Sequence, residues 1–318
     1  ELYHGDRVVE NKYTHISIGN INIDIAVYIE NFPSPGEGVL ATDLDIRPGG
    51  AASNYAVAVA QYGHRVYLIA SASSNEFAKI AISELRNKGV LVNRVKIVDS
   101  PPGIVVILIQ RGGERTMVKY PGANVELNAN DVPLELIRES HIVHMASINP
   151  KLALEISKKV KGSGALVTYD PGSYINLVDA ELIENIDILF LNEKELQELK
   201  KMMKADALFK RGLSILVVKR GEKGAVAILP NKTCIHGKTQ PIKKPVDATG
   251  AGDAFDAFFN AKFVESKDPS LALKYGVAAG ALKVGYKGSF LPFDARLFSL
   301  QLEKVLVEKG GECRIIDA

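Results

Sequence analysis

The chain has 318 residues, of which 47% are hydrophobic and 24% are charged, and its formal net charge is +2. This balance is typical of a globular protein with a substantial core, and it excludes a disordered or fibrous chain. So small a net charge also argues against nucleic-acid and membrane-surface binding, which usually depend on dense basic clusters.

The two cysteines, Cys234 and Cys313, have neither the spacing of a metal site nor that of a Cys-x-x-Cys redox motif. We therefore expect no disulfide and a reducing, cytoplasmic location. No apolar run reaches the length of a membrane span, and the first residues lack the pattern of a secretion signal.

Short β-rich runs alternate with helical patterns over most of the chain. Most of these runs are almost continuously apolar, as expected for parallel strands that are buried on both faces. The predicted strands span 15–19, 66–70, 142–145, 166–169, 186–191, 215–219 and 225–229. Because strands and helices alternate, we expect an α/β fold, a three-layer sandwich with a mainly parallel central sheet.

Two of the predicted helices have recognisable features. One carries Phe77, Ile80, Ala81 and Leu85 on a single apolar face and ends at Gly89. The other begins with Asn149 as N-cap and Pro150 at its first position.

Residues 21–47 and 103–120 interrupt the alternation with β-branched strands, Pro/Gly turns and no helix between them. Strands without crossover helices pair antiparallel, so we expect a small antiparallel sheet that serves as a lid over a ligand. An edge extension without a moving role is the alternative. The α/β domain would then consist of residues 14–20, 48–102 and 121–306.

Two candidate groups for binding a small molecule lie early in the chain. Gly49 and Gly50 permit close approach of a ligand, and Asn54, one turn into the next helix, can both donate and accept hydrogen bonds. Asp24 is a carboxylate among apolar neighbours, which is costly to bury unless it binds hydroxyl groups. A solvent-facing Asp on an edge strand is the alternative for Asp24.

Asn192 and Glu195 follow directly after a buried strand. This is the end of a parallel strand at which open α/β sheets bind ligands. The pair can start a helix as a capping box, or it can organise water around Mg²⁺, an ion that retains several waters.

The run from Val217 to Gly224 also ends a strand. Gly221 and Gly224 suit a tight turn, and Lys219 or the adjacent Arg220 could meet a phosphate. A hairpin turn with solvated basic residues is the alternative.

The run Asp247–Phe255 is the most informative part of the sequence. Gly250, Ala251 and Gly252 let backbone approach a ligand, and an amphipathic helix begins directly after them. The free N–H groups and the positive dipole end of that helix make the turn an anion site. Asp253 is at its mouth, where it can take a proton from an attacking hydroxyl; a helix N-cap is the alternative.

Three well-known nucleotide-binding and catalytic motifs are missing from the sequence. The segment Gly237-Lys-Thr239 has Lys232 where a Walker loop needs its first glycine, and neither a dinucleotide fingerprint nor a Gly-x-Ser-x-Gly elbow occurs.

Taken together, these motifs resemble the ribokinase-like, or PfkB, carbohydrate kinase family from about residue 14 to about residue 306. The Asp247–Phe255 run is similar to the C-terminal signature of that family and Gly49–Gly63 to its N-terminal signature. Asn192–Glu195 is similar to its Asn-x-x-Glu motif. The three motifs also occur in the family's order.

The resemblance implies a role for each candidate residue. It implies that the protein uses ATP and Mg²⁺, that a monovalent cation lies near Asp247 and Thr249, and that the lid forms a homodimer. The implied roles are catalytic base for Asp253, anion hole for the backbone of Gly250, Ala251, Gly252 and Asp253, acceptor binding for Asp24, Gly49, Gly50 and Asn54, nucleotide binding for Asn192, Lys219, Gly221 and Gly224, and metal and phosphate organisation for Asn192 and Glu195.

We therefore expect an ATP-dependent kinase that transfers the γ-phosphoryl group to a primary hydroxyl of a sugar or a ribose-containing nucleoside. The segment Gly19–Asp24 looks most like ribokinases, whereas Asp170–Ser173 looks like archaeal nucleoside kinases. The alternatives are a phosphofructokinase-like enzyme, with Arg111, Arg115 and Lys119 binding the acceptor's phosphate, a 2-keto-3-deoxygluconate kinase, and a catalytically silent sensor. Because Asp253 is next to a helix N-terminus, we expect its pKa to be lowered.

Overall fold

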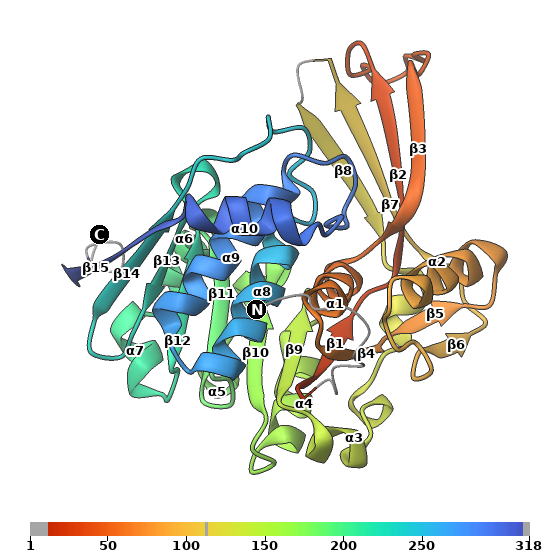
Figure 1. The fold of residues 1–318 in the computed structure, drawn as a ribbon. Helices are drawn as coiled ribbons and strands as arrows, with labels where there is room; N and C mark the ends of the chain where they lie inside the picture. Colours follow the sequence, from red (N-terminus) through yellow and green to blue (C-terminus); the bar gives the residue numbers. More distant parts are fainter. Residues whose placement is uncertain (1–11, 112–113, 314–318) are drawn as a thin grey trace.

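The computed structural model describes residues 12–111 and 114–313. In this part of the chain a large sheet of nine strands and a separate sheet of four strands dominate, and the smaller sheet rises from one end of the larger domain (Figure 1). No helix within the described ranges is long and apolar enough to cross a membrane.

The large sheet consists of six parallel strands, which begin at the edge strand β4, and three antiparallel strands, which end at the opposite edge strand β15. The parallel strands, from the near edge, are β4 (Arg65–Ile69), β1 (Thr14–Gly19), β9 (Ile142–Ala146), β10 (Leu166–Asp170), β11 (Ile188–Asn192) and β12 (Ile215–Lys219). The antiparallel strands are β13 (Ala225–Ile228), β14 (Thr233–Lys238) and β15 (Leu306–Glu312). A mainly parallel sheet was the expectation, and it is confirmed.

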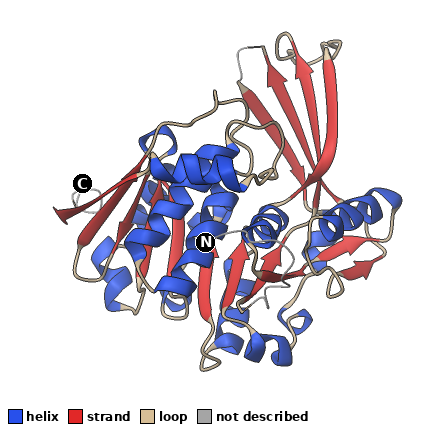
Figure 2. Ribbon diagram, viewed as in Figure 1, coloured by secondary structure: helices blue, strands red, loops and turns tan. Residues whose placement is uncertain are grey.

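The central strands are apolar on both faces because helices cover both faces (Figure 2). In β11, Ile188 and Phe190 belong to one buried cluster, while Leu189 and Leu191 belong to another on the opposite face. The first cluster lies under α1, α2, α8, α9 and α10, and the second lies under α3 to α7. The predicted three-layer α/β sandwich is therefore confirmed.

The helices of the described residues connect these strands. They are α1 (Ala51–Tyr62), α2 (Glu76–Asn87), α3 (Leu134–Glu139), α4 (Pro150–Val160), α5 (Ala180–Ile183), α6 (Glu193–Met202), α7 (Ala205–Lys210), α8 (Ala251–Ser266), α9 (Pro269–Lys283) and α10 (Ala295–Glu303). Short 3₁₀ turns are η1 (Gly122–Glu126), η2 (Ala129–Asp131), η3 (Gly172–Leu177) and η4 (Gly221–Lys223), and β5 (Ser71–Ser73) pairs with β6 (Lys96–Val98).

The sequence signals at the helices are partly correct. Asn149 caps α4 by accepting a hydrogen bond from the Lys151 N–H, as predicted. The predicted apolar face of α2 is half correct, because Ala81 and Leu85 are buried whereas Phe77 and Ile80 are 57% and 62% exposed. Helix α2 instead buries a face rotated by one position, with Ala78, Ala81, Ile82 and Leu85.

The smaller sheet, called the small sheet below, has the strand order β3 (Asp43–Gly49), β2 (Asn22–Ile29), β7 (Gly103–Gln110) and β8 (Arg115–Tyr120). Its two outer pairs are antiparallel, as expected. The two middle strands, β2 and β7, run parallel. They can do so because β3, α1, β4, β5, α2 and β6 lie between them in the chain and supply the crossover.

Cys234 and Cys313 form a disulfide, so the expectation of no disulfide is wrong. The two residues are 79 apart in sequence, and their Cα atoms are 5.3 Å apart. The antiparallel pairing of β14 with β15 brings them together. A contact created by pairing distant strands has no signature in cysteine spacing, which is why the sequence did not indicate it.

Candidate active site

The candidate site lies where the small sheet meets the carboxyl ends of the parallel strands. Asp24 comes from the small sheet, Asn54 from the first turn of α1, and Asp253 from the first turn of α8. A hydrogen bond and electrostatic interactions connect the three side chains, so the fold brings together residues that are far apart in sequence.

The glycine turn before α8 has the geometry of an anion site. Gly250 has a φ of 76°, in the left-handed region, and a Cβ there would be 1.9 Å from the carbonyl oxygen of Ser289. Only glycine fits this position, and no side chain caps the start of α8. The first N–H group, that of Ala251, donates to the Ala248 carbonyl oxygen at 3.2 Å. The N-cap residue is Gly250, so the alternative in which Asp253 caps the helix is wrong.

Asp253 is held by Asn54. The Asn54 Nδ2 donates to the Asp253 Oδ2 at 2.7 Å. Burial raises the pKa of Asp253 to about 6, although the hydrogen bond from Asn54 and the charge of Lys219 oppose this change. The expectation of a lowered pKa is therefore wrong, because loss of water outweighs the helix dipole at this position.

Asp24 is a buried carboxylate in the middle of the small sheet. It is 6% exposed, and its Oδ1 has no hydrogen-bond partner among the described residues. Burial raises its pKa to about 6, while the charge of Arg47 acts in the opposite direction and that of Asp253 raises it further. Strand β2 lies between β3 and β7, so the alternative of a solvent-facing residue on an edge strand is wrong.

The two predicted glycines make room for this arrangement. A Cβ on Gly49 would be 2.0 Å from the Asp24 Oδ2. Gly50 has a φ of 102°, and a Cβ there would be 2.3 Å from the Asn20 carbonyl oxygen. Asn54, which follows on α1, also has a buried Oδ1 without a partner in the described part of the chain.

A buried cluster of charges, which we call the Lys219 cluster, consists of Asp170, Lys219 and Asp256. The Lys219 Nζ donates to the Asp170 Oδ2 at 2.6 Å and to the Asp256 Oδ2 at 2.9 Å. The two carboxylates keep the pKa of Lys219 above its ordinary value despite burial. A Cβ on Gly252 would be 3.3 Å from the same Nζ, so the ammonium lies directly beside the glycine turn.

Sequence reasoning did not identify the carboxylates of this cluster. Asp256 lies in a helix whose other residues nearby are Phe and Ala, and it is fully buried. An acidic residue on the buried face of an apolar helix was the available signal, because such a group needs a partner.

Asn192 and Glu195 form a capping box at the start of α6. The Glu195 N–H donates to the Asn192 Oδ1 at 2.9 Å, and the Asn192 N–H donates to the Glu195 Oε2 at 2.8 Å. Burial and the nearby charge of Asp170 raise the pKa of Glu195 to about 7. Among the described residues no three His, Cys, Asp or Glu side chains are grouped as metal ligands. A carboxylate and an amide oxygen near a phosphate site fit an ion such as Mg²⁺ that retains most of its waters.

Gly221 and Gly224 lie in the turn between β12 and β13. Both have positive φ, 57° and 86°, and a Cβ on Gly221 would meet nothing within 4 Å. Arg220, beside this turn, donates to Glu193 at 2.9 Å. The turn therefore has free space beside Gly221, and the Arg220 side chain already forms an ion pair with Glu193.

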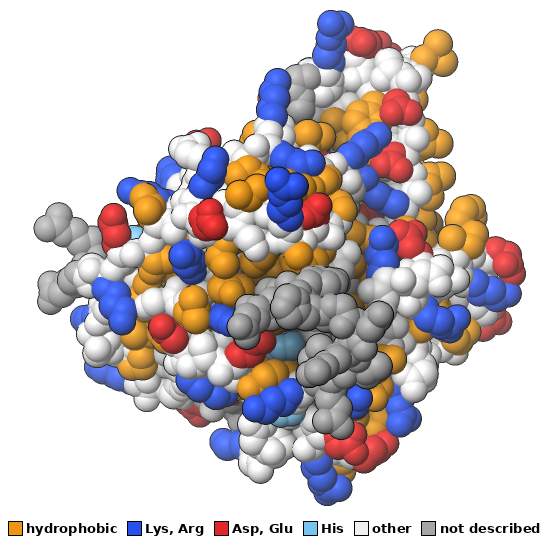
Figure 3. All heavy atoms as spheres, viewed as in Figure 1, with side chains coloured by type: hydrophobic (Ala, Val, Ile, Leu, Met, Phe, Trp, Pro, Cys, Tyr) orange, Lys and Arg blue, Asp and Glu red, His pale blue; other side chains and the backbone are white. Residues whose placement is uncertain are grey.

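Two basic side chains of the small sheet contact the segment Asp247–Thr249, which leads into the glycine turn. The Arg47 Nη2 is 3.5 Å from the Asp247 Oδ2, and the Arg115 Nη1 donates to the Thr249 Oγ1 at 3.3 Å. Figure 3 shows Lys and Arg side chains along the junction of the small sheet with the larger domain. Arg111 instead pairs with the exposed Glu30 at the outer part of the small sheet.

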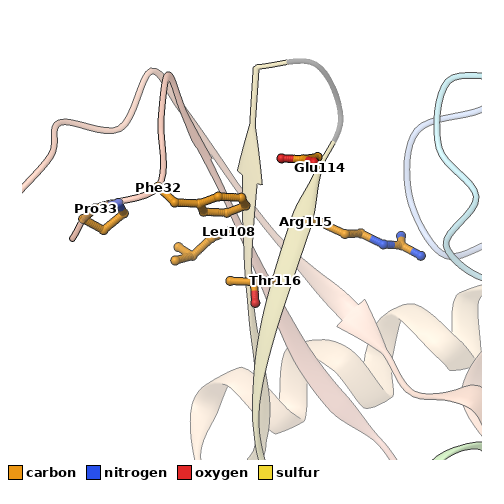
Figure 4. Close-up of a pocket in the computed structure, with 6 residues that line it drawn as sticks. All are labelled: Phe32, Pro33, Leu108, Glu114, Arg115 and Thr116. Atoms are coloured by element: carbon orange, nitrogen blue, oxygen red, sulfur yellow. The ribbon is translucent and has the colours of Figure 1, made fainter. Parts of the chain in front are cut away.

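A separate hollow of about 440 Å³ lies on the small sheet itself. Figure 4 shows Phe32 and Leu108 on one side of the strands and Arg115 pointing to the other side, toward the larger domain. Asp24, Asn54 and Asp253 do not line this hollow, so it is distinct from the candidate site.

Comparison with known proteins places these motifs in a family. Residues 14–296 match the family described as pfkB family carbohydrate kinase. The chain is 30% identical over 306 residues to a ribokinase of Arabidopsis thaliana, covering 91% of this chain and 80% of the relative. It is 29% identical over 277 residues to an ATP-dependent ribose-1-phosphate kinase of Halopiger xanaduensis, covering 86% and 93%.

Solved structures show the same fold. A ribokinase from Thermotoga maritima superposes with a TM-score of 0.82 at 27% identity, covering 92% of this chain and 99% of that one. The Arabidopsis thaliana ribokinase complexed with ribose and ATP superposes with a TM-score of 0.81 at 28% identity and the same coverage. The chain therefore belongs to the pfkB family of carbohydrate kinases, and it is an ATP-dependent sugar or nucleoside kinase with the ribokinase fold.

Proposed function

We propose that this kinase transfers the γ-phosphoryl group of ATP to the primary hydroxyl of a ribose-containing acceptor, held between the small sheet and α1. The observation that carries the proposal is the pair of buried acceptor atoms, the Oδ1 of Asp24 and the Oδ1 of Asn54, that lack donors in the described chain. Buried acceptors without donors are costly, and a ligand with several hydroxyl groups supplies the missing O–H donors.

The reaction follows from the position of Asp253 beside the glycine turn. The primary hydroxyl oxygen of the acceptor forms a bond to the γ-phosphorus, and the bond from that phosphorus to the oxygen bridging to the β-phosphate breaks. The hydroxyl proton passes to Asp253, and ADP leaves. Asn54 orients this carboxylate through its 2.7 Å hydrogen bond.

Burial supports Asp253 as the base. Its pKa of about 6 keeps it ionised at neutral pH and makes it a stronger base than an ordinary aspartate. In this proposal the N–H groups of the turn stabilise the charge of the phosphoryl group, above all those of Gly252 and Asp253, because the Ala251 N–H already donates to the Ala248 carbonyl oxygen. Such electrostatic stabilisation carries most of the catalysis in phosphoryl transfer.

The nucleotide and its metal ion are assigned to the ends of β11 and β12. We propose that Asn192 and Glu195 hold a hydrated Mg²⁺, which neutralises charge on the phosphates when bound. The open turn at Gly221 and Gly224 lies beside the nucleotide. Lys219 supplies a fixed positive charge next to Gly252 without leaving its two carboxylates.

The identity of the relatives supports a ribose-containing acceptor. The two relatives described above act, by their names, on ribose and on ribose 1-phosphate. Both acceptors carry a primary hydroxyl on C5. We therefore rank ribose, ribose 1-phosphate and nucleosides above hexose phosphates.

A phosphorylated acceptor is favoured by one further observation. Lys119 on β8 is close enough to Asp24 to lower its pKa, and Arg115 on the same strand reaches the glycine turn. When the C5 hydroxyl faces Asp253, a phosphate on C1 of ribose would lie at the other end of the acceptor, and we propose that it meets Lys119, whereas Arg115 stays at the glycine turn. Arg111 does not take part in this proposal, because it pairs with Glu30.

The small sheet is also the proposed dimer interface and lid. Its strands β3 and β8 expose Leu44, Ile46 and Val118 by 55%, 49% and 67%. Exposed apolar residues grouped on one sheet indicate a contact surface. We place the reaction in the cytoplasm, where its donor ATP is made.

An acceptor screen tests the proposal. ADP release is measured with ATP, Mg²⁺ and one acceptor at a time from a panel of ribose, ribose 1-phosphate, adenosine, fructose 6-phosphate and 2-keto-3-deoxygluconate. A ribose-containing compound should give the highest kcat/KM. Preference for fructose 6-phosphate would overturn the acceptor assignment, and no acceptor-dependent ADP release with any compound would favour a catalytically silent sensor.

A further inference from the structure

Lys283 is a buried lysine whose ammonium group binds backbone carbonyls. It is the last residue of α9, and its exposure is 0%. The Lys283 Nζ donates to the carbonyl oxygens of Asp247 and Tyr286, both at 3.1 Å. No ion pair of Lys283 occurs within the described ranges, in contrast to Lys219, which is held by two carboxylates.

The two carbonyls belong to the two loops that build the glycine turn. The N–H groups of Val246 and Asp247 both donate to the Val284 carbonyl oxygen, at 2.7 and 3.1 Å. Farther along the second loop, the Ser289 carbonyl packs against Gly250 so closely that no Cβ fits there. The ammonium of Lys283 therefore connects the loop that leads into the anion site with the loop that supports it.

This position is the one in which the family resemblance implies a monovalent cation. A cation near Asp247 and Thr249 would be held by backbone carbonyls and by the Asp247 carboxylate. That carboxylate already accepts from the N–H groups of Thr249 and Gly288, both at 2.9 Å, and faces Arg47 at 3.5 Å. The Asp247 carbonyl already accepts from Lys283.

A second cation does not fit these residues. It would compete with the Lys283 ammonium for the same carbonyl oxygens, and it would be repelled by the charges of Lys283 and Arg47. The residues present do not favour an added ion at this place.

We propose that the ammonium group of Lys283 is a built-in cation that takes the place of a monovalent metal ion beneath the anion site, so that the enzyme requires neither K⁺ nor Na⁺. Lys283 is in this view a positioning residue, because it acts through the loops and does not touch the substrates. This proposal rests on the proposed function in one respect, because the turnover measurements below need a kinase substrate.

The cost of burying this ammonium supports a functional role. Burial lowers the pKa of Lys283 to about 8, while the charges of Asp247 and Asp253 oppose this change and that of Arg47 adds to it. A charge kept in a protein interior with only carbonyl partners reduces stability. A Leu or Met side chain would satisfy the packing of α9 without this cost, so packing alone does not account for the lysine.

The unmodified enzyme gives the first test. Turnover and ADP binding by calorimetry are measured in KCl, NaCl and tetramethylammonium chloride at one ionic strength. We expect all three salts to give values within about twofold of one another, since no interaction with the metal ion is lost. Activation by K⁺ of about tenfold or more over tetramethylammonium would overturn the proposal, because it corresponds to a direct ion contact.

Two substitutions give the second test, with Lys274→Met on the same helix as the control. Lys283→Ala opens the space of the side chain, and Lys283→Met fills it without a charge. We expect both to lose about 10- to 100-fold in turnover in tetramethylammonium chloride, the size of a lost charged hydrogen bond. K⁺ or methylammonium should restore Lys283→Ala but not Lys283→Met. Full turnover of Lys283→Ala in every salt would contradict the proposal.

Thermal unfolding separates this proposal from the proposed function. The melting temperature of Lys283→Ala should rise with KCl relative to tetramethylammonium chloride, whereas the unmodified protein and Lys274→Met should show no difference. This measurement needs no acceptor, so it remains informative even if no kinase substrate is found. A melting temperature of Lys283→Ala that is equal in both salts would count against a vacated cation position.

Discussion

Asn54 and Asp253 are 199 residues apart in the chain, and the Asn54 Nδ2 donates a 2.7 Å hydrogen bond to the Asp253 Oδ2. The contact joins the first turn of α1 to the first turn of α8, where we propose that the acceptor and the phosphoryl group meet. In the proposed mechanism, the residue that binds the acceptor therefore also orients the base.

Replacing Asp253 by Asn should abolish turnover while ATP binding survives. Loss of a general base costs about 100- to 10,000-fold in kcat. The fold should be retained, because Asn has the same shape and its carbonyl oxygen still accepts from Asn54. Asp268→Asn, at the N-cap of α9, is the matched control, since Asn caps as well as Asp. Retention of more than about a tenth of kcat in Asp253→Asn would exclude Asp253 as the base.

The pKa of Asp253 predicts how activity depends on pH. Because this pKa is raised to about 6, kcat/KM should fall as the pH is lowered through about 6 and should level off above it. The pKa of Asp24 is raised to about 6 as well, so the two carboxyls titrate together. A profile that is flat from about pH 5 to 8 would contradict an ionised Asp253 as the base.

The raised pKa of Asp253 also predicts that the free energy of unfolding falls as the pH rises, whereas activity increases. A carboxyl whose pKa is raised by folding stabilises the folded state below its unfolded pKa, and this contribution is lost as the pH rises through the folded pKa. The contribution of Asp253 should therefore fall between about pH 4 and about pH 6. Denaturant unfolding of Asp253→Asn should show a smaller loss over this range than the unmodified protein shows. Equal losses would mean that Asp253 is not the titrating group.

Replacing Asp24 by Ala should damage acceptor use and leave ATP use almost unchanged. Hydrogen bonds to charged groups contribute about 1.5–3 kcal/mol, so kcat/KM for the acceptor should fall by about 10- to 150-fold. Glu30→Ala, at the end of β2 and exposed, is the control. A change in the KM for ATP as large as that for the acceptor would mean that Asp24 supports the site as a whole and does not bind the acceptor.

Replacing Glu195 by Gln should raise the Mg²⁺ concentration that gives half-maximal activity by about tenfold, since groups that organise a metal's waters typically matter by 10- to 100-fold. Gln keeps the capping hydrogen bond from the Asn192 N–H, so the start of α6 should remain intact. Glu198→Gln on the same helix is the control, because the side chain of Glu198 pairs with that of Lys201. An unchanged Mg²⁺ dependence would leave Asn192 and Glu195 as a helix cap.

The fold and the glycine turn were predictable because they rest on local patterns. Continuous apolar runs predict parallel strands, and Gly250 before the start of a helix predicts the glycine turn. The helix itself is not amphipathic as expected, because every residue from Ala254 to Ala261 is buried. The pKa of Asp253 was not predictable, because it depends on how much chain covers the carboxylate, and the helix dipole alone gave the wrong sign.

Contacts between segments that are distant in sequence also could not be predicted from the sequence. The bond of Cys234 to Cys313 and the pairing of Lys219 with Asp170 and Asp256 arise only when strands and helices far apart in sequence pack together. Lys283 illustrates the same point, because no motif in the sequence marks it. Only the fold reveals that its ammonium is buried under the glycine turn.

The most direct test of the central claim is the identity of the phosphorylated atom. The enzyme is incubated with ATP, Mg²⁺ and ribose or ribose 1-phosphate, and the product is examined by phosphorus–proton correlation NMR. A new phosphate ester coupled to the C5 methylene protons, absent with Asp253→Asn, is the predicted result. A phosphate on any other hydroxyl, or ATP consumption that releases only inorganic phosphate, would contradict the account.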